Sequence, residues 1–175
     1  MSAKESKPRS AESYLAWARL WARYIDLSLY VFLIGISVVL FVRDFATLNQ
    51  AAMVLLLLPP ALVVDAVVIG RFGTSIGKLI AGVRVVGATG ESPGFGASVR
   101  RNVGVYFAFG VGVGFIAPIT LIVAYFGLRR TGSTWWDRGA GTQVVSAGST
   151  PLRTINAALV YVALVVGSAA LAASR

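Results

Sequence analysis

Four charged residues inside long apolar stretches are the first candidates for chemistry. Arg19, Arg23 and Asp26 fall in the first apolar stretch, and Asp65 falls in the second. On a helix with 100° per residue, the first three share a stripe about 60° wide. An ionisable side chain inside a membrane helix costs about 2.5–3.5 kcal/mol, so it usually finds a partner or serves an ion, proton or substrate site.

The sequence allows two interpretations of this intramembrane charge cluster. Arg23 and Asp26 are i,i+3 neighbours that can pair directly. Antiparallel helices would also bring Arg23 level with Asp65, roughly 9 Å from the inner end of the second helix. With Arg19 included, two arginines and two aspartates make a cluster with no net charge. The cluster is either an ion site or a structural clamp between helices, with Arg19 extending to the headgroups.

Composition places these residues in an integral membrane protein. The chain has 175 residues, of which 57% are hydrophobic and only 13% charged, whereas soluble domains average about 25% charged residues. Its mean hydropathy is +0.76. Histidine and cysteine are absent, which excludes disulfides, Cys/His zinc sites and Ser-His or Cys nucleophiles. We expect no enzyme activity, no cofactor and no metal.

The apolar runs predict an all-α, polytopic helical membrane protein. A spanning helix needs about 20 mostly apolar residues, and such helices are expected near 15–42, 47–70, 102–128 and 154–173. Residues 1–13 are polar and predict a disordered tail. This gives three to four membrane helices.

The third apolar segment decides the topology. Four simple spans would place the basic connector 129–153 outside, against the positive-inside rule. The segment contains Gly110, Gly112, Gly114 and Pro118, so it is either a single kinked span or a re-entrant hairpin that returns the chain to the inside. We expect a multi-pass protein of the cell membrane with a cytoplasmic N-terminus. The chain has a net charge of +9, and its basic residues flank the apolar runs. This arrangement favours anionic lipid headgroups over nucleic acid as partners.

The two polar connectors contain the remaining patterns. In residues 71–101, "AGVRVVGATGESPG" predicts a short strand, a turn and a return strand. The nearby "GTSIGKL" lacks the spacing of a phosphate-binding loop. In residues 129–153, "TWWDRGAGT" places Asp137 beside Arg138, an arrangement typical of a surface ion pair.

Taken in order, these segments resemble the RDD family of small integral membrane proteins. The resemblance covers roughly residues 14–146 and leaves 147–175 as an additional transmembrane helix. Trp136 stands where the family usually has a polar residue or histidine, and the second family aspartate is Asp137 or Asp65. The matched positions are Arg19 and Asp26 in the first helix, Ser75, Gly77, Lys78 and Gly82 in the loop that follows the second, Arg100 and Arg101 before the third segment, and Asp137, Ala140, Gly141 and Thr142 in the last connector.

The resemblance implies two alternative functions. Family members are linked to transport, some with activity like that of cation/proton antiporters, which implies an exchange role for Asp26 and Asp65. Other members occur within larger membrane assemblies, which implies a non-catalytic accessory or structural subunit. Either role leads us to expect a homo-oligomer or a subunit of a membrane complex.

Overall fold

The computed structural model describes residues 9–41, 49–108 and 116–173. Three long helices dominate it: α1 (Arg9–Phe41), α2 (Gln50–Phe72) and α7 (Pro151–Ala173). Each contains a segment long and apolar enough to cross a membrane, namely Tyr14–Phe41, Leu55–Phe72 and Pro151–Ala170. The predicted all-α polytopic class is confirmed.

Helix α1 starts earlier than the sequence pattern indicated. It begins at Arg9, so residues 9–13, expected to be disordered, are helical. Helix propagation adds one hydrogen bond per ordered residue, whereas nucleation is costly, so a long packed helix extends readily into a polar flank. Residues 1–8 of the predicted tail lie outside the described part of the chain.

The third apolar segment is divided between two helices. The single helix expected over 102–128 is replaced by α4 (Gly94–Ala108) and α5 (Ile116–Thr131). At 1.5 Å per residue they are about 22 and 24 Å long, shorter than the ~30 Å hydrocarbon core. The glycines Gly110, Gly112 and Gly114 lie outside the described residues. The described residues of this segment form two separate helices, as the re-entrant hairpin alternative expected.

A two-stranded sheet joins the two connectors. Strand β1 (Val83–Val86) pairs antiparallel with β2 (Gln143–Ser146), with Val85 opposite Val144. The predicted first strand is correct, but the predicted local return strand is wrong, because the partner lies 60 residues further along. Residues after β1 instead close a turn in which Gly87 N–H donates to Glu91 O at 2.8 Å. Pairing with β2 buries Val85 and Val144 in the core, which a local hairpin would not achieve.

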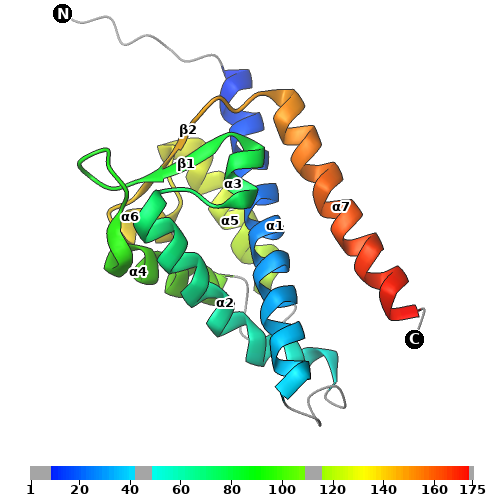
Figure 1. Cartoon of the computed structure of the whole chain (residues 1–175). Helices are drawn as coiled ribbons and strands as arrows, with labels where there is room; N and C mark the ends of the chain where they lie inside the picture. Colours follow the sequence, from blue (N-terminus) through cyan, green and yellow to red (C-terminus); the bar gives the residue numbers. More distant parts are fainter. Residues whose placement is uncertain (1–8, 42–48, 109–115, 174–175) are drawn as a thin grey trace, which may run out of the picture.

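The sheet places both basic connectors at the same end of the molecule. The short helices α3 (Ile76–Ala81) and α6 (Trp135–Gly139) lie there too, α3 against α1 and α6 against α4 (Figure 1). Helices α4 and α5 leave this end and return to it, since α6, just after α5, contacts α4. The conflict between the 129–153 connector and the positive-inside rule therefore disappears.

The main core lies between α1, α3, the sheet and α7. Ala18, Ala22 and Ile25 on one face of α1 pack with Val85 and Val144 of the sheet. Helix α7 runs beside α1, on the side away from α4 (Figure 1). Aromatic contacts hold it there, with the Tyr161 ring centroid 5.7 Å from that of Trp21 and 5.2 Å from that of Tyr24.

Single-cysteine labelling tests the shared side of the connectors. The sequence contains no cysteine, so Thr89→Cys, Ala147→Cys and Asn49→Cys each introduce one exposed thiol. We expect a membrane-impermeant maleimide to label positions 89 and 147 from the same side. Asn49 precedes α2 at the other end of that helix and should react only from the opposite side. Labelling of 89 and 147 from opposite sides would contradict the paired sheet.

Candidate functional site

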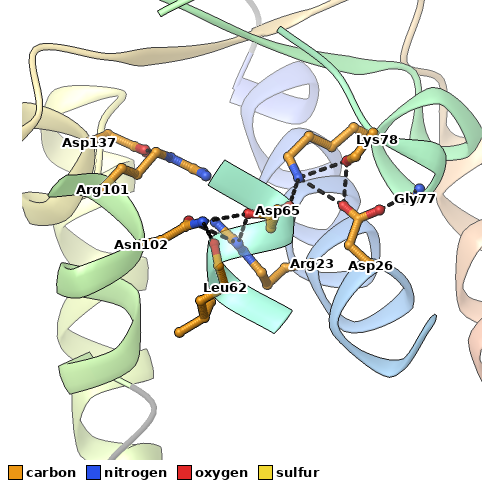
Figure 2. A network of polar contacts seen from close by, with 10 residues as sticks. Arg23, Asp26, Leu62, Asp65, Gly77, Lys78, Arg101, Asn102 and Asp137 are labelled. Carbon is orange, nitrogen blue, oxygen red and sulfur yellow. Dashed lines mark hydrogen bonds and ion pairs between the residues drawn. The ribbon is translucent and has the colours of Figure 1, made fainter. Parts of the chain in front are cut away.

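Two carboxylates from the membrane helices meet two cations in the interior. Arg23 Nη1 lies 2.6 Å from Asp65 Oδ2, which joins α1 to α2. Lys78 Nζ lies 2.8 Å from Asp26 Oδ2 and 3.5 Å from Asp65 Oδ1, so it bridges both carboxylates (Figure 2). All four side chains are buried. The structure thus brings together three members of the predicted charge cluster, Arg23, Asp26 and Asp65.

Asp26 does not pair with Arg23, as the i,i+3 spacing had suggested. Its carboxylate accepts hydrogen bonds from Lys78 Nζ, the Ser75 hydroxyl and the Gly77 backbone N–H. These donors come from the stretch "GTSIGKL", and the anion it binds is a carboxylate of the same chain. The donors satisfy Asp26 more fully than Arg23 alone would. Arg23 is thereby left for Asp65.

Helix α3 reaches Asp26 because residue 77 has no side chain. A Cβ on Gly77 would lie 2.3 Å from Ala22 O and 3.0 Å from Asp26 Oδ1. Gly82 then ends α3 with a φ of +68°, in the left-handed region that favours glycine. The spacing of Ser75, Gly77 and Gly82 therefore fits a short helix pressed against α1.

Asn102 completes the network and was not a sequence-based candidate. Its Nδ2 donates to Asp65 Oδ2 at 2.9 Å and to Leu62 O at 2.8 Å, and its Oδ1 accepts from Arg23 Nη1 at 3.2 Å. The amide thereby ties α4 to α1 and α2. Asn102 is the first residue of a 27-residue uncharged run. That position could have marked it as a candidate, because a buried amide needs hydrogen-bond partners.

A second buried pair lies beside the first. Arg101 Nε donates to Asp137 Oδ1 at 2.6 Å, and the Thr134 hydroxyl donates to Asp137 Oδ2 at 2.7 Å. The expected surface pair of Asp137 with Arg138 is wrong, because Arg138 donates instead to the Thr131 hydroxyl. The sequence neighbours point apart because α6 turns Asp137 inward, where it is only 1% exposed.

The family segment after Asp137 forms the turn from α6 into β2. Gly141 has a φ of +65°, and Thr142 N–H donates to Asp137 O at 2.9 Å. Ala140 is buried at the end of α6. Burial raises the pKa of Asp137, but Arg101 and Thr134 outweigh that effect and hold this pKa below its usual range. The turn thus presents an ionised carboxylate to Arg101.

Arg19 contacts backbone carbonyls rather than a carboxylate. Its guanidinium donates to the carbonyls of Val144 and Gly132, so it ties α1 to the second connector. The interpretation in which Arg19 extends to the headgroups stays a prediction. Arg19 therefore stands beside the carboxylate network without being ion-paired in it.

A pocket of about 560 Å³ lies next to these groups, and three arginines line it. Arg19 Nε, Arg23 Nη2 and Arg101 Nη1 are buried and have no hydrogen-bond partner. A buried donor without a partner costs about 1–3 kcal/mol. The other lining residues are mainly apolar: Ala16, Trp17, Leu20, Val105, Ile122, Ala124, Tyr125, Phe126, Leu128, Thr134, Trp136, Asp137 and Val144.

The fold and its buried pairs define a polytopic helical membrane protein whose connectors are fastened to the membrane helices by ionic contacts. The chain belongs to the RDD family, whose sequence model matches residues 15–141, more than half of the chain. Helix α7 lies beyond the matched region. Neither the curated proteins nor the solved structures compared with the chain include a match.

Removing one partner of the Arg23–Asp65 pair should destabilise the protein strongly. Asp65→Asn leaves the Arg23 charge buried without a counter-ion, and the expected loss is about 3–5 kcal/mol. The measurement is denaturant unfolding in detergent, with Glu91→Gln as the exposed-carboxylate control. Arg23→Met combined with Asp65→Leu should recover most of the loss. Wild-type stability of Asp65→Asn alone would contradict a tight ion pair.

The depressed pKa of Asp137 predicts a specific acid response. Its ionised form stabilises the fold above the unfolded-state pKa of about 3.9, and that contribution is lost as the pH falls through the lower folded-state pKa. The stability difference between wild type and Asp137→Asn should be constant from pH 7 to about pH 4.5 and shrink at more acidic pH. Unfolding curves across this range measure it. A difference that grows on acidification would overturn the assignment.

Proposed function

We propose that this RDD-family membrane protein is a non-enzymatic accessory or structural subunit of a larger membrane assembly. The observation that carries the proposal is the state of its buried carboxylates. Asp26, Asp65 and Asp137, the three that are buried in the described part of the chain, each have a cation within 2.6–2.8 Å. A cation/proton exchange site would need a carboxylate free to bind an ion or proton in alternation.

The outer surface of the bundle supports membership of an assembly. Helix α7 contacts α1 and α3, while apolar residues such as Leu159, Val162 and Val166 are more than half exposed. Small residues, including Gly167 and Ser168, lie on the same helix and suit close helix packing. This surface is available to lipid or to a partner helix.

The charges at the end of the molecule that contains both basic connectors support a cytoplasmic position for that end in the cell membrane. Exposed arginines at that end suit the cytoplasmic side, where anionic lipids attract basic segments. This orientation also places the N-terminus in the cytoplasm. The exposed arginines are Arg71, Arg84, Arg100, Arg129, Arg130, Arg138 and Arg153.

One observation favours the second candidate, cation/proton exchange. Asp65 Oδ1 is buried without a hydrogen-bond partner and lies 3.5 Å from Lys78 Nζ, so it is the least satisfied carboxylate oxygen of the network. A proton or small cation at this oxygen would compete with Lys78. The ion pair that Asp65 Oδ2 makes with Arg23 weighs against such exchange.

Two measurements separate the candidates. Native mass spectrometry after gentle extraction from the native membrane should show other subunits at fixed stoichiometry. Purified protein in proteoliposomes should show no cation-driven proton flux. A lone monomer or homo-oligomer with flux would overturn the proposal. Loss of that flux in Asp65→Asn but not in Glu91→Gln would then assign exchange to Asp65.

A further inference from the structure

The three arginines around the pocket have hydrogen-bonding capacity that the described residues do not use. We propose that the pocket between α1, α4, α5 and α6 binds an anionic membrane phospholipid, with the phosphate at Arg19, Arg23 and Arg101 and an acyl chain along the apolar wall. The inference is independent of the accessory role, because it rests on the pocket alone.

Unpartnered donors mark where the phosphate would bind. Arg23 and Arg101 are 6% and 5% exposed, yet Arg23 Nη2 and Arg101 Nη1 have no acceptor. Arg19 Nε is the third such donor. The other nitrogens that make contacts are held by Asp65, Asp137 and backbone carbonyls. All three residues line the same pocket, where an anion would supply the missing acceptors.

The charge balance of the site favours an anion. Four cations, Arg19, Arg23, Lys78 and Arg101, surround three carboxylates, which leaves an excess of one positive charge. Asp137 also lines the pocket, but Arg101 and Thr134 already bind its two oxygens. Guanidinium groups match phosphate oxygens in geometry and are less strongly hydrated than ammonium groups, so they suit a partly buried phosphate.

The pocket wall and rim favour a lipid over a free phosphate ion. Val105 and Ala124 form buried apolar wall, and the exposed rim residues are Trp17, Ile122 and Phe126. These rim residues lie on helices of the membrane bundle, so the opening faces acyl chains. A volume of about 560 Å³ falls within the ~300–1,000 Å³ typical of small-molecule sites.

Arg19 and Arg23 lie at increasing depth along α1, so a phosphate that contacted all three arginines would be drawn well below the interface. Arg19 lies five residues and Arg23 nine residues after Tyr14, where the first membrane span begins. At 1.5 Å per residue these positions are about 8 and 14 Å along the helix. A lipid can reach such a site from its own leaflet, with its acyl chain along the apolar wall of the pocket.

Native mass spectrometry of the full chain in detergent tests the site. The probes are phosphatidylglycerol and phosphatidylcholine with identical acyl chains, and inorganic phosphate as a competitor. We expect phosphatidylglycerol to bind at least about tenfold more tightly than phosphatidylcholine, and inorganic phosphate not to displace it. Arg19→Gln should weaken binding about tenfold, the loss expected for one charge-assisted hydrogen bond.

Matched variants separate the pocket from general electrostatic attraction. Arg130→Gln removes an exposed charge from the same end of the molecule and should leave affinity unchanged. Ala124→Trp fills the pocket without altering charge and should abolish binding, whereas Ile119→Trp on the exposed face of α5 should not. Ala124→Leu serves as a milder filling variant if the Trp variant does not fold.

Several results would overturn the proposal. Equal affinity for the two lipids would show that the pocket does not distinguish an anionic headgroup from a zwitterionic one. Unchanged phosphatidylglycerol binding in both Arg19→Gln and a folded pocket-filling variant would place the lipid elsewhere. Displacement by inorganic phosphate would show that the site takes a free anion and not a lipid.

Discussion

The cost of placing charge inside a membrane bundle is the constraint on which this structure depends. Asp26 and Asp65 are fully buried on two membrane helices, and neither position is tolerable without a nearby cation. Arg23 supplies one cation from the same bundle, but the second, Lys78, comes from a connector. Folding of the connector against the helices is therefore a condition for burying both aspartates.

That condition propagates through the rest of the connector end. Once α3 holds Lys78 and Gly77 against Asp26, the chain that follows enters β1 directly through Gly82. Strand β1 then finds its partner in β2, and the second connector comes to lie beside the first. Arg101 and Asp137 fasten that second connector to α4 in the same manner. Two ion-paired attachments, one for each connector, thus organise this end of the protein together with the core around the sheet.

The sequence predicted the membrane class and the approximate helices because hydrophobic runs carry that information locally. It also placed Arg23 level with Asp65, since depth along a helix follows from residue spacing. It could not predict that Lys78 would take Asp26, because that choice depends on a loop 50 residues away and on the close approach allowed at Gly77. The strand pairing failed for the same reason, since two short strands contain no signal for their partner. The inward turn of Asp137 depends on how α6 packs, which neighbouring residues do not determine.

The buried aspartates and arginines of the network differ in how fully their hydrogen-bonding groups are used. Each buried carboxylate has a cation: Asp26 and Asp137 have several donors each, and Asp65 binds Arg23, Asn102 and Lys78, although its Oδ1 has no hydrogen-bond partner. The guanidinium groups are not fully committed, because arginine offers five donors and the pairs use only some of them. Four cations beside three carboxylates also leave an excess of one positive charge near the pocket. The ion pairs that stabilise the fold therefore also determine the sign of the ligand that the adjacent pocket can accept.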